Sequence, residues 1–153
     1  MIGCTVQQLC NAVGGTLLQE SGAVVTEVST DSRSIPVGAL FVPLVGERFD
    51  GHDYLYAALE RGAAGCLTAR KPASLLKDKF YIQVSDTLEA LKALAAWYRD
   101  RFAIPMVQVT GSAGKTTTKE MIAAVLSQRF STLKTQANFN NAIGTPMTLL
   151  NLS

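Results

Sequence analysis

Long apolar runs and a strong charge of one sign are both missing from this sequence of 153 residues. No apolar run reaches the length that a membrane-spanning helix needs, and the N-terminus lacks the basic and apolar stretches of a signal peptide. The net charge is only +2, and no basic stripe alternates with aromatic residues, so a nucleic-acid partner is not expected. These absences favour a globular protein of the cytoplasm.

Cysteine and histidine are also scarce. The three cysteines, Cys4, Cys10 and Cys66, are odd in number and show no C-x-x-C spacing, so neither a disulfide framework nor a metal centre is expected. Reduced thiols suit a cytoplasmic protein. His52 is the only histidine. It lies between two aspartates and could act as an acid or base, although a hydrogen-bonding role in a loop is the simpler interpretation.

What is present is a regular alternation of strand and helix patterns, which favours an α/β fold with mainly parallel pairing. Hydrophobic content of 48% and charged content of 17% suit a packed core. Helices are predicted at 5–13, 54–61, 86–102, 115–129 and 145–152. Strands are predicted at 16–18, 24–29, 39–44, 65–68, 80–84, 106–109 and 131–134.

Several helix starts carry capping residues. Thr5 and Gln8 form a potential capping box, and Asp86 and Glu89 have the same spacing. Asp53 can cap the helix predicted at 54–61.

The order of the elements predicts two domains with a boundary near residue 85. Residues 1–85 form a small α/β domain, and residues 86–153 begin a second α/β domain around a mononucleotide-binding turn. Few strands follow the boundary, whereas a nucleotide-binding sheet usually has five or more. We therefore expect the second domain to be truncated after Ser153.

The stretch 107–120 organises this second domain. The apolar run at 106–109 predicts a buried parallel strand, a small-residue turn follows at 110–114, and Lys115 opens a helix. The predicted inward-facing residues of that helix are Met121, Ile122, Val125 and Leu126. Consecutive N–H groups of such a turn form a nest for an anion, and the helix N-terminus adds partial positive charge. Strand, glycine turn and helix start therefore predict a site for nucleotide phosphates.

The residues of this turn have distinct expected roles. The Lys115 ammonium would reach the terminal phosphates as a catalytic group, and the Thr116 hydroxyl would help to bind Mg2+. The expected ATP-binding residues here are Gly111, Ser112, Ala113, Gly114, Lys115, Thr116 and Thr117. Val109 stands where the general P-loop pattern has its first glycine, so the motif is the shorter T-G-x-x-G-K-T-T. An ordinary strand-to-helix turn with a solvated lysine is the alternative interpretation.

Four stretches together resemble one family, the ATP-dependent Mur ligases of peptidoglycan synthesis. They are T-D-S-R at 30–33, G-A-L-F-V-P-L-V-G-E-R-F-D-G-H-D at 38–53, T-G-S-A-G-K-T-T-T-K-E-M at 110–121 and N-F-N-N-A-I-G-T-P-M-T-L-L at 138–150. The resemblance covers essentially the whole chain, in order. The second and fourth stretches most resemble the branch of the family that adds D-alanyl-D-alanine to UDP-MurNAc-tripeptide.

The resemblance implies a cytoplasmic, monomeric, three-domain ligase that uses ATP and Mg2+. ATP would phosphorylate the terminal carboxylate of UDP-MurNAc-tripeptide, and the amine of D-alanyl-D-alanine would displace phosphate from the acyl phosphate. The acidic and histidine metal ligands of the family, its carbamylated lysine and its third domain would lie beyond Ser153. We therefore expect a fragment that cannot complete the reaction alone.

The resemblance also implies site residues. For the UDP substrate they are Asp31, Ser32, Arg33, Phe49, Asp50, Gly51 and His52. Asn138 and Asn141 would join the ATP site. The alternatives are a polar turn with a surface arginine, a surface loop anchored by its aromatic residue, and asparagines that form turns or cap a helix.

Two other functions remain compatible with the sequence. One is a different P-loop enzyme, either a sister ligase of the family or a small kinase. The other is a non-catalytic module that binds only a UDP-sugar.

Overall fold

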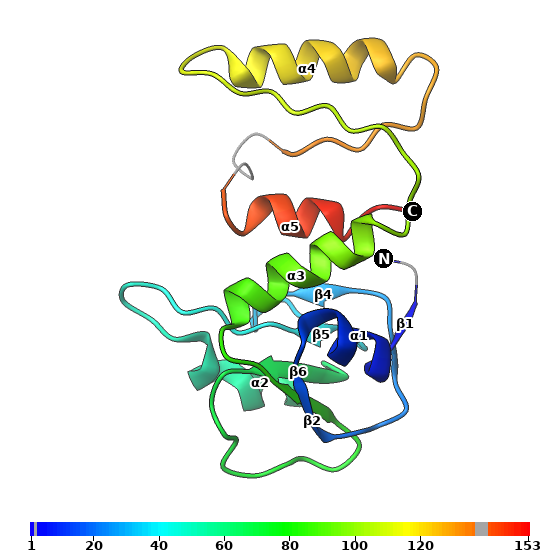
Figure 1. Cartoon of the computed structure of the whole chain (residues 1–153). Helices are drawn as coiled ribbons and strands as arrows, with labels where there is room; N and C mark the ends of the chain where they lie inside the picture. The colour runs from blue at the N-terminus through cyan, green and yellow to red at the C-terminus, as the bar shows by residue number, and fades with distance from the viewer. Residues whose placement is uncertain (2, 137–140) are drawn as a thin grey trace.

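The computed structural model describes residues 1, 3–136 and 141–153, and it shows a mixed α/β protein (Figure 1). The strands are β1 (Cys4–Thr5), β2 (Thr16–Gln19), β3 (Val24–Val25), β4 (Val28–Ser29), β5 (Leu40–Phe41), β6 (Gly65–Thr68) and β7 (Phe80–Gln83). The helices are α1 (Val6–Val13), the 3-10 helix η1 (Gly51–Tyr54), α2 (Leu55–Glu60), α3 (Thr87–Arg99), α4 (Lys115–Leu126) and α5 (Gly144–Leu149). Within the described residues, no helix has the length and apolar content needed to cross a lipid bilayer.

Five strands form the main sheet in the order β2-β7-β6-β5-β4, and β1 pairs with β3 in a small second sheet. In the main sheet, as far as the structure describes it, β4 to β7 run parallel to one another and β2 runs antiparallel beside β7. The predicted α/β class with mainly parallel pairing is therefore confirmed. The carboxyl ends of β4 to β7 all lie at one edge of the sheet, which we call the carboxyl edge.

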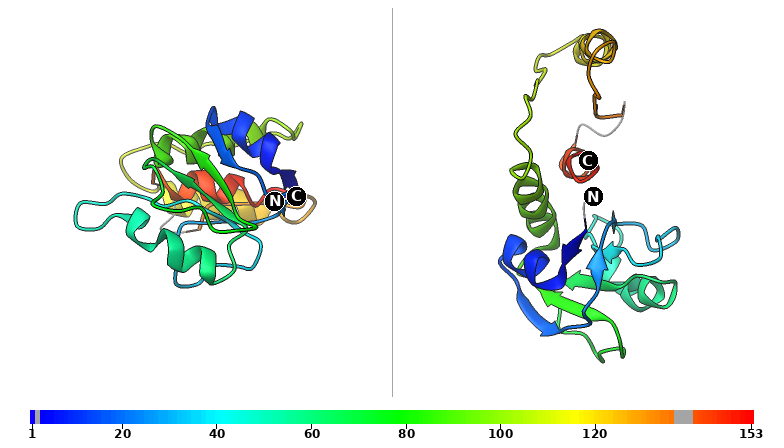
Figure 2. Two further views of the ribbon diagram at one scale, coloured as in Figure 1. Left: turned by 90° about the horizontal axis from the view of Figure 1, so that it is seen from below. Right: turned by 90° about the vertical axis from the view of Figure 1, so that its right-hand side faces the viewer.

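Helices cover both faces of the main sheet (Figure 2). On one face, buried strand residues such as Leu40 and Ile82 pack in a common core with α1 and α3. On the other face, Phe41 and Cys66 pack against α2. This division follows from strand geometry, because successive side chains point to opposite faces. Burial on both faces explains why the strands have continuous apolar sequences.

The first and third helices begin at the polar residues that the sequence indicates. The Thr5 hydroxyl accepts a hydrogen bond from the Gln8 amide, and the Gln8 side chain accepts one from the Thr5 amide. The predicted capping box is therefore confirmed. At the start of α3, the Asp86 carboxylate accepts a hydrogen bond from the Glu89 amide at 2.9 Å.

Helix α3 joins the sheet to the C-terminal part of the chain. One side of α3 packs on α1, and α5 packs on α3 as well (Figure 1). The Tyr98 hydroxyl donates a buried hydrogen bond to the Leu152 carbonyl at 2.7 Å. Leu150 is buried in the same core as Tyr98, so α5 docks firmly on α3.

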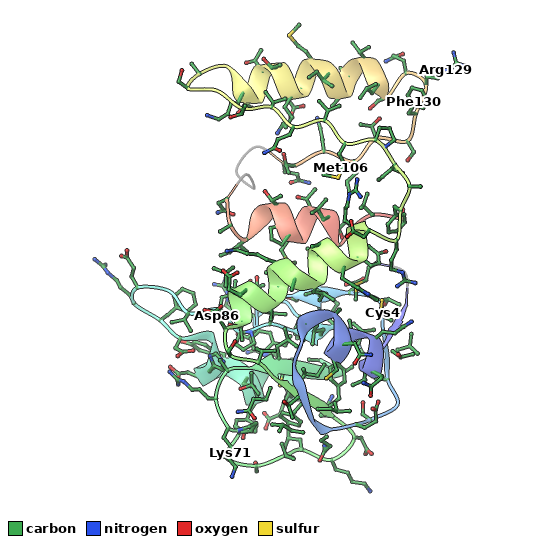
Figure 3. The ribbon with its side chains drawn as sticks, viewed as in Figure 1. Cys4, Lys71, Asp86, Met106, Arg129 and Phe130 are labelled. Atoms are coloured by element: carbon green, nitrogen blue, oxygen red, sulfur yellow. The ribbon has the colours of Figure 1, made fainter. Side chains whose placement is uncertain are left out.

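The buried strand predicted at 106–109 is absent, and that prediction is wrong. Residues 103–110 run as an irregular connection from α3 to α4 and make no backbone hydrogen bond with any other described residue. Met106 and Val107 are 56% and 62% exposed, and Figure 3 shows Met106 on this connection. The physical reason is that a strand needs a neighbour, and no described strand pairs with this segment.

Helix α4 also departs from expectation. It ends at Leu126, and Met121 and Val125, which the sequence predicts to face inward, are 65% and 72% exposed. Ala123 is its buried residue. Figures 1 and 2 show α4 lying apart from the sheet, so no apolar layer of the sheet covers its face.

Smaller corrections concern element boundaries. The strand predicted at 24–29 is divided between two sheets, because β3 pairs with β1 whereas β4 pairs with β5. No strand forms at 131–134. The turn before α2 is capped by Asp50, which accepts a hydrogen bond from the His52 amide at 2.8 Å, and not by Asp53 as predicted.

Candidate functional site

Three loops leave the carboxyl edge next to one another, because β4, β5 and β6 are neighbours in the sheet. They contain residues 30–33 after β4, residues 42–50 after β5 and residues 69–71 after β6. In sheets of this kind, ligands bind outside the carboxyl ends of the strands. The first two loops and η1 hold the residues assigned from the sequence to a UDP substrate.

In the loop after β4, Arg33 is paired with Asp31. Its Nε donates to Asp31 Oδ1 at 3.0 Å, and its Nη2 donates to Asp31 Oδ2 at 3.1 Å. The hydrogen bonds from the Arg33 side chain lower the pKa of the Asp31 carboxyl to about 2. The Arg33 side chain is 84% exposed, so its outer edge faces solvent, where an anion can reach it.

Ser32 lies differently from Arg33. It is buried, and its carbonyl accepts a hydrogen bond from Arg61 Nη1 at 2.8 Å. The Ser29 hydroxyl accepts a further hydrogen bond from the Asp31 amide at 3.2 Å. The backbone of this loop is therefore fixed at several points, whereas Arg33 extends into solvent.

The loop after β5 presents an aromatic ring at its tip. Val45 and Asp50 form an antiparallel bridge, and the Gly46 amide donates to the Phe49 carbonyl at 2.9 Å. The Phe49 ring lies against Gly46, where a Cβ would stand 2.5 Å from a ring carbon, yet Phe49 is 60% exposed. At the base, Gly51 is buried, and a Cβ there would stand 2.7 Å from a backbone nitrogen. An exposed, fixed aromatic ring suits stacking on a nucleobase.

Asp50 and His52 lie below this tip and are partly buried, with side chains only 16% and 4% exposed. Asp50 Oδ1 lies 2.7 Å from His52 Nδ1, and Asp50 Oδ2 bonds to the Arg70 guanidinium. Partial burial raises the pKa of the Asp50 carboxyl, but the hydrogen bonds from His52 and the charge of Arg70 outweigh it, so the pKa lies below its ordinary value. His52 Nε2 accepts a hydrogen bond from the Ala69 amide at 2.9 Å.

Arg70 is a candidate that sequence reasoning missed. Its side chain is 61% exposed, and its guanidinium bonds to Asp50 and lies 3.7 Å from Asp53. Arg70 and Lys71 help to line a hollow of about 170 Å3 beside His52. The sequence signal was a basic pair directly after a strand, which places it at the carboxyl edge once the sheet is known.

The glycine turn at 111–114 leads straight into α4. Gly114 is the residue before the helix and has φ 76°, a left-handed conformation that glycine adopts without strain. No described acceptor takes a hydrogen bond from the amides of residues 112–117. These amides are therefore available at the N-terminus of a twelve-residue helix, where anions are favoured.

The residues of this turn are exposed except Lys115, which is half-buried. Lys115 Nζ donates to the Gly111 carbonyl, so the ammonium lies across the turn. Thr116 is exposed in the first turn of α4. One turn further along, Lys119 Nζ donates to the Thr135 carbonyl at 2.6 Å and so ties α4 to the segment that follows it.

Of the two asparagines assigned to the ATP site, Asn138 lies outside the described residues. Asn141 Oδ1 accepts hydrogen bonds from the amides of Ile143 at 3.2 Å and Gly144 at 2.7 Å. In this structure its carbonyl oxygen therefore caps the start of α5, which leaves its amide nitrogen for other partners.

The tips of the two candidate regions lie on the same side of the molecule. Figure 1 shows the loop after β5 (cyan) and the start of α4 (yellow) both on the left. A larger hollow of about 420 Å3 lies elsewhere, between Met1, residues 26–28 and α5, and none of the candidate residues lines it.

Two models of one protein family match the chain. The model described as "Mur ligase family, catalytic domain" matches residues 24–125, which is more than half of the chain. The model described as "Mur ligase middle domain" matches residues 109–153, from the glycine turn onward.

Individual relatives cover the chain closely but extend well beyond it. The chain is 50% identical over 129 residues to the UDP-N-acetylmuramoyl-tripeptide–D-alanyl-D-alanine ligase of Synechocystis sp., a match covering 84% of this chain and 28% of the relative. A crystal structure of MurF from Acinetobacter baumannii matches with TM-score 0.92 and 36% identity, over 99% of this chain and 33% of that one. The chain thus spans about a third of the length of the relatives it matches.

A further structure adds a ligand to the comparison. MurF ligase from Thermotoga maritima, in complex with ADP, matches with TM-score 0.74 and 36% identity over 82% of this chain and 29% of that one. The family models, the relatives and the shared fold agree, and the chain belongs to the Mur ligase family.

Proposed function

We propose that this chain forms the UDP-substrate-binding and ATP-binding part of a UDP-N-acetylmuramoyl-tripeptide–D-alanyl-D-alanine ligase (MurF). The names of its relatives support this branch of the family over a sister ligase or a small kinase. The observation that carries the proposal is the glycine turn, with its available amides at the start of α4.

The chemistry of the reaction explains why such a turn is needed. A carboxylate and the γ-phosphate of ATP are both anionic and repel each other as they approach. Fixed N–H dipoles and a cation offset that repulsion when the acyl phosphate forms. We propose that the amides of residues 112–117 hold the phosphates and that Lys115 leaves the Gly111 carbonyl to meet the terminal phosphates.

The described residues suit a site in which the protein supplies few of the Mg2+ ligands. Thr116 offers one exposed hydroxyl beside the proposed phosphate site. Among the described residues, no group of three or more histidine, cysteine or acidic side chains is arranged so that it could hold a metal ion. We therefore propose that Thr116 holds Mg2+ together with phosphate oxygens and water. Bound there, Mg2+ would neutralise charge on the phosphates.

For the UDP end of the substrate, we propose direct contacts from Arg33 and Phe49. Arg33 supplies a cationic fork for the diphosphate, and Phe49 supplies a ring for the uracil. Ser32 and Gly51 are buried, and the side chains of Asp50 and His52 are largely covered, so we propose that these residues support the site from behind.

We also propose the division into a UDP-substrate domain at 1–85 and the beginning of an ATP domain at 86–153, with α3 as the connection between them. Buried reduced cysteines suit a cytoplasmic location. Dipeptide ligation by the 153-residue chain alone is not expected, because its relatives are about three times as long.

Calorimetric titration tests the proposal. We expect the chain to bind UDP-MurNAc-tripeptide and Mg2+-ADP, and Lys115→Ala to weaken Mg2+-ADP binding about tenfold or more, because a charge-assisted contact is lost. Lys119→Ala is the matched control, since Lys119 lies one helical turn further along and its Nζ donates to the Thr135 carbonyl. Mg2+-ADP binding without UDP-MurNAc-tripeptide binding would indicate another P-loop enzyme. Binding of only the UDP compound would indicate a non-catalytic module.

A further inference from the structure

We propose that His52 is a positioning residue of the UDP-substrate site, held as the neutral Nδ1–H tautomer that bridges the loop after β5 to the loop after β6. This inference rests on the proposed function. It assigns His52 a different role from a direct substrate contact, and it adds Ala69 and Arg70 to the group of residues that shape the site.

The tautomer follows from the two partners of the ring. The Ala69 amide lies 2.9 Å from His52 Nε2, and an amide can only donate a hydrogen bond. Nε2 must therefore carry a lone pair. Nδ1 then carries the hydrogen and donates it to the Asp50 carboxylate at 2.7 Å. Both polar atoms of the ring are satisfied within the chain.

Burial of the His52 ring keeps other hydrogen-bond partners away from both of its nitrogens. The His52 side chain is only 4% exposed, so a substrate could reach a ring nitrogen only by displacing Ala69 or Asp50. Displacement would leave a buried polar group without a partner, which is unfavourable. Asp50 is equally occupied, because it accepts from the His52 amide, from Nδ1 and from Arg70.

The bridge controls the aromatic tip through Asp50. Asp50 also pairs with Val45 in a short antiparallel β-bridge, and the loop tip that contains Phe49 lies between these two residues. Asp50 also caps η1, which contains His52. The position of the exposed Phe49 ring therefore depends on whether His52 holds the base of its loop against Ala69.

The charged groups around the ring favour the same arrangement. Asp50 faces Nδ1, while Arg70 bonds to Asp50 and lies near Asp53. Lys71 helps to line the adjoining hollow. The Asp50 carboxylate therefore meets the Nδ1–H donor and the Arg70 guanidinium at once.

Nitrogen NMR of the unaltered chain tests the tautomer directly, because the sequence contains one histidine and its ring signals need no assignment. We expect a protonated-type Nδ1 signal and an unprotonated-type Nε2 signal at about pH 8. Saturation with UDP-MurNAc-tripeptide should shift the NMR signals of Phe49 and leave the His52 ring in the Nδ1–H tautomer. An Nε2–H tautomer, or a ring nitrogen that changes partner when the substrate binds, would overturn the proposal.

Substrate affinity tests the consequence. We expect His52→Ala to weaken UDP-MurNAc-tripeptide binding about tenfold, as one lost buried hydrogen-bonding group would, and His52→Gln to recover part of it by accepting from Ala69. Tyr56→Phe is the control. It removes a hydroxyl that bonds to Ser74, in the loop after β6, and leaves the hydrogen bonds of His52 to Asp50 and Ala69 in place. Amide exchange at Ala69 should accelerate in His52→Ala and not in Tyr56→Phe.

The outcomes separate the two proposals. If the unaltered chain does not bind UDP-MurNAc-tripeptide, the proposed function fails and the positioning role fails with it. If the unaltered chain and His52→Ala bind equally well, or Tyr56→Phe weakens binding as much as His52→Ala, only the positioning role is overturned.

Discussion

Arg33 meets Asp31 through two side-chain hydrogen bonds, Nε to Oδ1 at 3.0 Å and Nη2 to Oδ2 at 3.1 Å. The pair holds the guanidinium plane at the carboxyl edge, one residue beyond the buried Ser32. A bidentate pair of this kind fixes orientation as well as charge. The Arg33 guanidinium is therefore held in a set direction without burial of its charge, which suits the proposed contact with a substrate anion.

Replacing the planar guanidinium of Arg33 by the ammonium of lysine should reduce substrate binding. We expect Arg33→Lys to weaken UDP-MurNAc-tripeptide binding about tenfold, because lysine cannot reproduce two parallel hydrogen bonds. Calorimetric titration measures the change. Arg129→Lys is the control, since Arg129 is exposed beyond the end of α4 (Figure 3). Equal affinities of Arg33→Lys and Arg129→Lys would show that Arg33 does not contact the substrate.

The left-handed conformation of Gly114 makes a second prediction. A Cβ at Gly114 meets no atom within 4 Å, so Gly114→Ala adds only backbone strain of about 1 kcal/mol. Relief of that strain would rotate the amides at the start of α4, and we expect Mg2+-ADP binding to weaken at least fivefold. Gly22→Ala carries the same strain at φ 68°, also in open space. It should leave Mg2+-ADP binding unchanged in the same titration, and a loss there would point to a general effect on folding.

The cap of α3 should contribute measurably to stability, because α3 joins both parts of the chain. Asp86→Ala removes the acceptor of the Glu89 amide, and we expect the free energy of unfolding to fall by about 1 kcal/mol. Urea unfolding followed by circular dichroism measures it. Asp100→Ala, at the exposed opposite end of the helix, should change stability by less than about 0.5 kcal/mol. A larger loss from Asp100→Ala than from Asp86→Ala would contradict this account of the helix.

The lowered pKa of Asp50 predicts a dependence of stability on pH. Because the folded-state pKa lies below the ordinary value of 3.8, Asp50 stabilises the folded state fully above that value. The contribution is lost as the pH falls through the lower folded-state pKa. Asp31 titrates in the same acidic range, so its effect must be separated.

The separation uses two variants and thermal unfolding midpoints measured across the acidic range. Asp50→Asn should flatten the decline in unfolding midpoint that the unaltered chain shows on acidification. Asp31→Asn measures the share of Asp31 in that decline, because this variant keeps the Asp50 carboxyl. The account fails if Asp50→Asn retains the full decline.

The sequence by itself determined the features that depend on local chemistry. The capping box of Thr5 and Gln8, the cap at Asp86 and the helix start after Gly114 each require only residues close together in the chain, and all three are present. The parallel α/β class also followed, because apolar strand patterns alternate with amphipathic helices. Family likeness located the polar loops at 30–33 and 46–53.

The tertiary structure alone decided what depends on neighbours distant in sequence. An apolar stretch becomes a strand only beside another strand, so the run at 106–109 is exposed where no described strand pairs with it. Met121 and Val125 are exposed for a related reason, because the sheet does not pack against α4 (Figure 1). The sequence favoured a hydrogen-bonding role for His52 in its loop, but only the structure identifies the partner of its second nitrogen as the amide of Ala69, seventeen residues away. Hydrogen-bond partners of a buried ring are set by packing, and no local pattern in the chain encodes them.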